Sequence, residues 1–171
     1  IEACVKLKLG RTSLDGLHVA VQGVGHVGYH LCKELVSRGA KLSVADVDPL
    51  KSERAQREFG AAIVPLDQIF EVECDVLAPC ALGSAIKDDT VPRIKAKVVA
   101  GAANNQLHEP RHGDDLNARG ILYAPDYAIN AGGLINVAQE YAGYDADKAR
   151  AKASEVYGTI AEIARRAIAT G

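Results

Sequence analysis

Short runs of β-branched and small apolar residues alternate along this 171-residue chain with longer amphipathic stretches. Such runs are typical of buried strands, and their alternation with helices is typical of βαβ units that build a parallel sheet. The pattern predicts an α/β fold: a doubly wound, mostly parallel six-stranded sheet with helices on both faces. The expected strands are residues 18–22, 41–46, a run around Ile63, and residues 75–79, 97–101 and 121–125.

Apolar residues between the first two strands recur at the spacing of one helix face. Val27, Leu31 and Leu35 stand at i, i+4 and i+8, and Gly39 follows where a left-handed cap is expected. We therefore expect this helix to pack on the sheet through that face. Asp48, which directly precedes a proline, is expected to cap the next helix.

The two ends of the chain flank this alternating region. Residues 1–13 are expected to form a leading helix and loop before a domain of residues 14–144. The tail, residues 145–171, is expected to be one long helix with Asp145 as its N-cap. The expected buried face of this helix consists of Ala149, Ala153, Val156, Ile160, Ile163 and Ala167.

The stretch VAVQGVGHVGYHL places three glycines between the first expected strand and its helix. In the dinucleotide-binding (Rossmann) turn, the first glycine permits the tight turn, the second lets the backbone approach a pyrophosphate, and the third lets the helix lie close to the strand. The helix N-terminus then offers N–H groups and a partial positive charge to the phosphates. The candidate phosphate site consists of Gly23, Val24, Gly25, His26, Val27 and Gly28.

An acidic residue should complete this fingerprint about 20 residues further on, at the end of the second strand. Asp46 stands there, and its carboxylate can accept hydrogen bonds from the adenosine ribose while repelling a 2′-phosphate, so NAD is favoured over NADP. Asp48 could compete for this role. His26 could lie near the phosphates or face solvent, with no catalytic role. The alternative interpretation is that the glycines only shape a bend between two core elements.

The loops after the later strands are polar or rich in small residues: APCALGSAI, GAANNQL and APDYAINAGGLIN. Ligands of doubly wound sheets bind at the carboxyl ends of the strands, so these loops are expected to ring the same crevice as the glycine turn. An Asn side chain offers a donor and an acceptor without charge, which suits a neutral carboxamide and a ribose. The candidates are Asn104, Asn105 and Asn130, whose structural alternatives are a polar turn for the first two and a helix N-cap for the third.

Five phrases of the chain closely resemble the cofactor-binding domain of the leucine, phenylalanine and valine dehydrogenases, within the glutamate dehydrogenase superfamily. They are VQGVGHVGYHL, ECDVLAPCALG, VVAGAANNQL, EPRHGDDL and GILYAPDYAINAGGLINVAQE. The resemblance extends over residues 14–144. It implies the reversible deamination of an L-amino acid to a 2-oxo acid and ammonia, with hydride transfer to NAD.

The resemblance also implies roles for residues around the crevice. Asp46 would bind the adenosine ribose, and Asn104 or Asn105 would bind near the nicotinamide ribose. Asn130 would lie beside the nicotinamide and the substrate. The backbone bordering the nicotinamide end would belong to Pro79, Cys80 and Ala81.

Leu134 and Val137 are three residues apart after Asn130, so they share one face of a helix there. In the family, this face resembles the wall of the substrate side-chain pocket. An apolar wall leaves a side-chain carboxylate unpaired, so leucine, valine or isoleucine is the expected substrate. The alternatives are a phenylalanine dehydrogenase and a stand-alone NAD-sensing module without catalysis. For the two residues themselves, the alternative is an ordinary core position.

Composition argues against several other classes of protein. The chain has 20 basic and 22 acidic residues and no basic stripe, so we expect no nucleic-acid partner. No apolar run approaches the roughly 20 residues that a membrane span needs. Cysteines without metal-ligand spacing predict no metal site and are expected to be small core residues in a reducing, cytoplasmic compartment: Cys4, Cys32, Cys74 and Cys80.

The chain lacks the glycine-rich lysine segments on which catalysis in this family depends. We therefore expect no catalytic residue here, and NAD binding without turnover, because no general acid or base faces the nicotinamide. The chain starts at Ile1 and contains no Met, so we expect it to be half of a longer enzyme. The N-terminal catalytic domain would be its missing partner, and the full-length enzyme would be a homo-oligomer.

Overall fold

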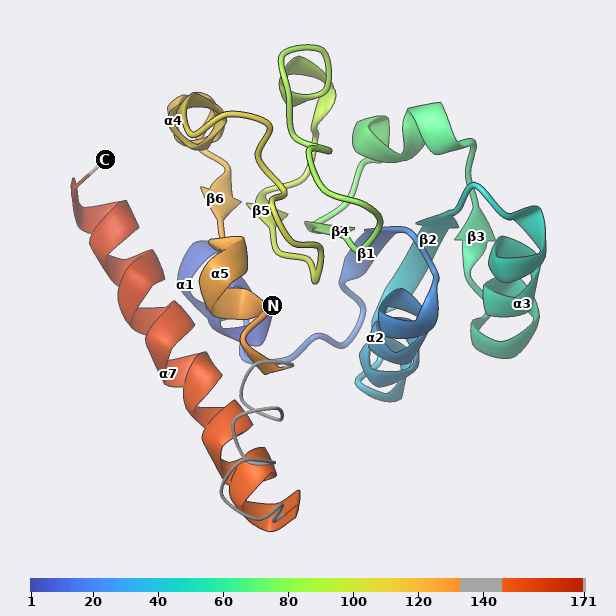
Figure 1. The fold of residues 1–171 in the computed structure, drawn as a ribbon, viewed down its shortest axis with the longest axis horizontal. Coiled ribbons are helices and arrows are strands. Elements are labelled where there is room, and N and C mark those ends of the chain that lie inside the picture. The colour runs from blue at the N-terminus through green and yellow to red at the C-terminus, as the bar shows by residue number, and fades with distance from the viewer. Residues whose placement is uncertain (133–145, 171) are drawn as a thin grey trace.

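The computed structural model describes residues 1–132 and 146–170, in which helices and strands alternate along most of the chain (Figure 1). The elements labelled η1 and η2 are 3₁₀ helices. In chain order the elements are α1 (Glu2–Leu9), β1 (His18–Gln22), α2 (His26–Ser37), β2 (Lys41–Ala45), α3 (Pro49–Phe59), β3 (Ala62–Ile63), η1 (Leu66–Glu71), β4 (Val76–Pro79), η2 (Val91–Arg93), β5 (Val98–Val99), α4 (Arg111–Ala118), β6 (Leu122–Tyr123), α5 (Asp126–Ile129) and α7 (Ala146–Thr170).

Six strands form one sheet in the order β3-β2-β1-β4-β5-β6, and all neighbouring pairs are parallel. The doubly wound parallel sheet predicted from the sequence is confirmed. The chain moves outward from β1 through β2 and β3, then returns to place β4 on the other side of β1. Gln22 at the end of β1 pairs in register with Ala45 of β2 and Pro79 of β4, so three carboxyl ends lie at one edge.

Alternate strand residues face two separate cores, one on each side of the sheet. Val19 and Val21 of β1 pack in the core that includes α1, α2 and α7, whereas Ala20 packs with η1, η2 and α4. The helix α7 runs along one end of the molecule, where it contacts α1, α5 and β6 (Figure 1). Both faces of the sheet are therefore covered, as predicted.

The helix after β1 differs from its predicted packing in one position. Val27 is 55% exposed, so its expected place on the buried face is wrong. The buried face consists of Gly28, Cys32 and Leu35 instead. Because α2 begins at His26, Val27 lies in the first turn of the helix, and its side chain is not part of the buried face.

Two predicted helix caps are present. Gly39 follows α2 with a positive φ of 83°, as expected of a left-handed cap. Asp48 is the N-cap of α3, and its Oδ1 accepts the backbone N–H of Leu50 at 3.0 Å. Both caps therefore set the helix ends that the sequence indicated.

The long C-terminal helix is confirmed, but its buried face is shorter than predicted. Ile160, Ala161 and Ala164 are buried, whereas Ala153 and Ala167 are exposed, contrary to expectation. The helix packs against α1, α5 and β6, and Ala153 and Ala167 lie outside the buried part of this contact. The expected N-cap, Asp145, lies outside the described residues.

Candidate functional site

The candidate site lies at the carboxyl edge of the sheet, at the ends of the neighbouring strands β1 and β4. After β1 the chain enters α2 on one face, and after β4 it enters the loop that leads to η2 on the other. The two ends stay joined, because the Cys80 N–H donates to the Gln22 carbonyl at 2.7 Å. A doubly wound sheet has its ligand crevice at such a point.

The glycine turn has the geometry that its sequence predicted. Gly23 has a φ of 89°, which favours glycine. A Cβ at Gly28 would lie 2.0 Å from the Gly23 carbonyl oxygen, so only glycine lets α2 approach the strand this closely. A Cβ at Gly25, in contrast, would meet no atom within 4 Å. The middle glycine therefore borders open space, which fits a bound group that approaches the backbone.

Asp46 joins the end of β2 to this turn. Its Oδ2 accepts the Val24 N–H at 2.8 Å, and its Oδ1 accepts the Asp48 N–H at 2.9 Å. The side chain is only 7% exposed, and Lys51 Nζ lies 3.9 Å from Oδ1. A carboxylate oxygen has two lone pairs, so both oxygens keep the capacity to accept a further hydrogen bond from a hydroxyl.

The segment of Pro79, Cys80 and Ala81 lies between the glycine turn and the loop after β5. On one side, a Cβ at Gly23 would be 2.7 Å from the Ala81 nitrogen. On the other, the Pro79 carbonyl accepts the N–H of Ala103 at 2.9 Å. Burial raises the pKa of the Cys80 thiol to about 11, so this thiol is neutral at physiological pH.

The asparagines predicted at the crevice are brought together in part. Asn130 Nδ2 donates to Asn104 Oδ1 at 2.6 Å. Asn105 has a positive φ of 49°, and its carbonyl accepts the Ser84 N–H at 2.6 Å. The contact between asparagine side chains therefore involves Asn104, while the backbone of Asn105 forms the turn.

Asn130 is the C-cap of α5, a one-turn helix that the sequence interpretation left as loop. The chain after Asn130 is described only as far as Gly132, so the expected N-cap role lies at the limit of the described residues. Leu134 and Val137, the predicted substrate-pocket residues, lie outside the described residues.

Three polar residues at this edge were not identified from the sequence. Asp126 Oδ2 accepts the N–H of Gln106 at 2.6 Å, and Gln106 is completely buried. Gln22 ends β1, and within the described residues its buried Oε1 has no hydrogen-bond partner. The available signal was position alone, since both Gln22 and Asp126 stand at or just after the end of a strand.

A cavity of about 510 Å³ opens beside Gln22, on the η1 side of the sheet. Its walls include Phe70 of η1 together with Leu82 and Ser84 of the loop after β4. Leu82 is 93% exposed, so an apolar side chain of the cavity wall is open to solvent. The cavity extends the site beyond the residues that the sequence indicated.

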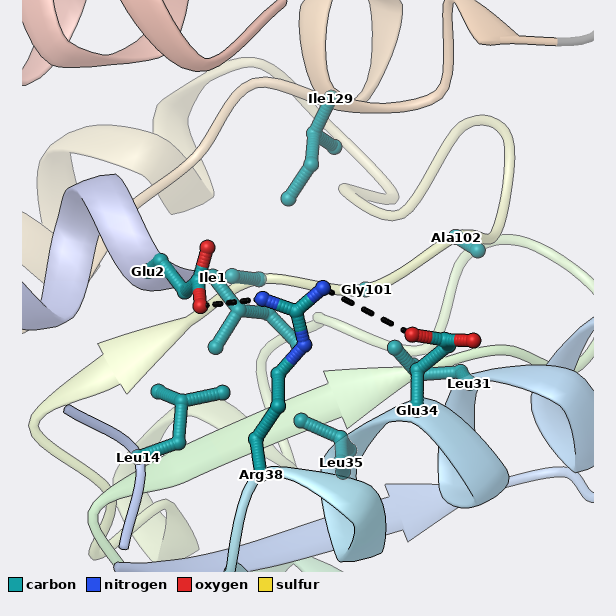
Figure 2. Close-up of a pocket in the computed structure, with 11 residues that line it drawn as sticks. Ile1, Glu2, Leu14, Leu31, Glu34, Leu35, Arg38, Gly101, Ala102 and Ile129 are labelled. Atoms are coloured by element: carbon teal, nitrogen blue, oxygen red, sulfur yellow. Dashed lines mark hydrogen bonds and ion pairs between the residues drawn. The ribbon is translucent and has the colours of Figure 1, made fainter. Parts of the chain in front are cut away.

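A second pocket of about 270 Å³ lies on the opposite face, between α1, α2 and α5 (Figure 2). Figure 2 shows Arg38 between two carboxylates, at 2.5 Å from Glu2 and 3.6 Å from Glu34. These partners, Glu2 first, raise the pKa of Arg38. Gly101 and Ile129 also line this pocket, but none of the predicted cofactor residues does.

Within the part of the chain that the structure describes, no three side chains of metal-ligating type converge. Among the same residues, no helix is both long and apolar enough to cross a membrane.

Comparison with known proteins adds independent evidence. The family model described as glutamate/leucine/phenylalanine/valine dehydrogenase matches residues 44–170. Leucine dehydrogenase of Bacillus cereus is 52% identical over 163 residues, which are 95% of this chain and 44% of that protein. Leucine dehydrogenase of Thermoactinomyces intermedius is 54% identical over 169 residues, covering 97% of this chain and 46% of that protein. The chain thus spans less than half the length of these relatives.

Comparison with solved structures also finds an amino acid dehydrogenase. The crystal structure of L-tryptophan dehydrogenase from Nostoc punctiforme matches with a TM-score of 0.91 and 46% identity, over 94% of this chain and 49% of that one.

Proposed function

The chain belongs to the glutamate/leucine/phenylalanine/valine dehydrogenase family, and from that premise we propose that it is the NAD-binding half of an amino acid dehydrogenase. Residues 14–144 would form the NAD-binding domain, between a leading segment of residues 1–13 and a helical tail of residues 145–171. The observation that carries the proposal is the Asp46 carboxylate, held 2.8 Å from the Val24 N–H of the glycine turn.

In this proposal the pyrophosphate rests on the turn formed by residues 23–28. The open space beside Gly25 would admit it, and the exposed first turn of α2 would supply N–H groups. Asp46 would accept hydrogen bonds from the adenosine ribose. A 2′-phosphate would bring negative charge to the same carboxylate, so NAD would be preferred to NADP.

The other half of the crevice would hold the nicotinamide. Asn104 and Asn130 would provide amide groups there, with Asn105 shaping the turn beside them. The backbone of residues 79–81 would separate the two halves of the dinucleotide. When bound, NAD would supply the hydride acceptor. The chain's own residues would orient it and exclude water from its reactive face.

The complete reaction would be the reversible oxidative deamination of an L-amino acid to a 2-oxo acid and ammonia. Its acid and base groups would belong to a separate catalytic domain, because the chain contains no glycine-rich lysine segment. We propose leucine, valine or isoleucine as substrate, with Leu134 and Val137 in the pocket wall, and homo-oligomeric assembly for the full-length enzyme. The matched leucine dehydrogenases support this choice.

A phenylalanine or other aromatic amino acid dehydrogenase is the second candidate. The observation in its favour is the fold likeness to an L-tryptophan dehydrogenase. The third hypothesis is a dinucleotide-sensing module without catalysis. The Asn104–Asn130 amide pair at the proposed nicotinamide end gives it no support.

Titration calorimetry with NAD⁺ and NADP⁺ tests the cofactor assignment. We expect NAD⁺ to bind at least about tenfold more tightly, a difference of about 1.4 kcal/mol. Asp46→Ser should lower this preference. Asp48→Ser is the matched control, because serine keeps the helix cap of α3 while removing the neighbouring carboxylate. Tighter NADP⁺ binding, or no binding of either dinucleotide, would refute the proposal.

The absence of turnover is tested separately. The chain mixed with leucine and NAD⁺ should give no increase in NADH absorbance, because the proton-transferring groups would be missing. NADH formation at an enzyme-like rate would show that catalytic residues lie within these 171 residues.

A further inference from the structure

Two hydrogen bonds join a loop and a short helix on the wall of the crevice. The loop of residues 101–106 follows β5, and α5 follows β6. Asp126, the first residue of α5, accepts the Gln106 N–H at 2.6 Å. Asn130, at the other end of α5, donates to Asn104 at 2.6 Å. The two bonds span one helical turn, so they fix the position and rotation of α5 relative to the loop.

Buried hydrogen bonds of Gln106 and Ala103 attach this loop to the sheet. The Gln106 side chain is fully buried, and its Nε2 donates to the carbonyls of Gly101 at 2.8 Å and Ala103 at 3.0 Å. The Ala103 N–H in turn bonds to Pro79 at the end of β4. Asp126 therefore holds α5 to a loop that is already fixed to the sheet.

The short helix depends on such outside contacts. Four residues make one turn, and a helix of that length is not stable on its own. The backbone carbonyl of Asp126 accepts the Asn130 N–H at 2.9 Å, so Asn130 closes the turn that Asp126 begins. The Asp126 N–H contacts the Tyr123 hydroxyl at 3.3 Å. Loss of the Asp126 carboxylate would leave the Gln106 N–H without its acceptor and release α5 from the loop.

We propose that Asp126 is a positioning residue that fixes the Asn104–Asn130 amide pair at the nicotinamide end of the site. The inference rests on the proposed function, because it assigns the pair to the nicotinamide. With Asn104 Oδ1 and an Asn130 N–H bonded to each other, the pair still offers the Asn104 amide nitrogen and Asn130 Oδ1. A primary carboxamide has the complementary acceptor and donor, so a fixed pair recognises it better than two mobile side chains.

The test compares NAD⁺ with ADP-ribose, which lacks the nicotinamide. Calorimetry on Asp126→Ala should give NAD⁺ affinity at least about fivefold weaker than wild type, with ADP-ribose affinity unchanged within about twofold. Asp126→Asn keeps an acceptor oxygen and should restore NAD⁺ affinity to within about threefold of wild type. Asp114→Ala removes an exposed aspartate of α4, on the other face of the sheet, and should change neither affinity.

Hydrogen exchange of the Gln106 amide provides a readout that needs no ligand. Protection should be high in wild type and Asp126→Asn, and at least about tenfold lower in Asp126→Ala. Unchanged protection, unchanged NAD⁺ affinity, or equal loss of NAD⁺ and ADP-ribose in Asp126→Ala would overturn the positioning role while leaving the proposed function intact. A wild-type chain that binds neither ligand would overturn the proposed function itself.

Discussion

Single atoms decide the geometry of the glycine turn. The carbonyl of Gly23 lies where a Cβ of Gly28 would be, and the Val24 N–H points at Asp46. These two contacts bring the start of α2 and the end of β2 to one point at the edge of the sheet. The turn therefore depends on the absence of one side chain and the presence of another.

Replacement of Gly28 by alanine tests this close approach. The new Cβ would be 2.0 Å from a backbone oxygen, which no side-chain rotation relieves, so we expect a loss of about 3 kcal/mol in the free energy of unfolding. Urea denaturation measures it. Gly158→Ala is the control: that position in α7 has open space around it, and alanine should stabilise the helix by about 0.5–1 kcal/mol. Equal effects at both positions would contradict the steric argument.

The long helix α7 packs against the rest of the molecule through a short part of its length. Of α7, which spans Ala146–Thr170, the middle part packs against α1 and β6 through Ile160, Ala161 and Ala164. Most of the other α7 side chains that the structure describes are exposed. Most of the stabilisation from this 25-residue helix should therefore come from about one and a half turns.

Truncation of Ile160 to alanine should cost about 2–4 kcal/mol, because the side chain is 3% exposed and its loss leaves a cavity. Ile168 offers the matched comparison on the same helix. It is 52% exposed, so Ile168→Ala should change stability by less than about 0.5 kcal/mol. Thermal unfolding of the two variants gives the values. A larger loss at Ile168 than at Ile160 would mean that α7 packs through a different face.

The whole molecule is two cores on either side of a parallel sheet, with the crevice at the carboxyl edge, where the connections after β1 and β4 leave on opposite faces. The helices near the two ends of the chain, α1 and α7, pack together on one side. The cysteines are distributed through this interior, and all four are free thiols: Cys4, Cys32, Cys74 and Cys80.

Because the pKa values of these thiols are raised in the folded state, we expect the free energy of unfolding to fall at alkaline pH. Burial raises the pKa of Cys32 to about 12, and of Cys74 and Cys80 to about 11, from the ordinary value of 9.0. Unfolding exposes the thiols and lets them ionise, so their contribution to stability is complete below pH 9 and is lost as pH rises through 11. Urea denaturation across this range measures it. A triple variant with alanine at Cys32, Cys74 and Cys80 should show a shallower alkaline loss, and an unchanged slope would contradict the assignment.

The sequence by itself determined the six strands, the helices α2, α3 and α7, and the edge of the sheet where the crevice lies. The short β-branched and small apolar runs, the three glycines and Asp46 are local patterns, and local sterics or adjacent hydrogen bonds suffice to specify them. The doubly wound parallel sheet was also predicted, because alternating strands and helices are typical of βαβ units, whereas the order of the strands was not.

Only the tertiary structure decided how the crevice is lined. The exposure of Val27, the pairing of Asn130 with Asn104, and the bond from Asp126 to Gln106 could not be predicted. The last two join residues 26 and 20 positions apart, between the loop after β5 and the short helix α5, so no local pattern specifies them. They exist because β5 and β6 lie side by side in the sheet and bring the loops at their carboxyl ends within hydrogen-bond distance.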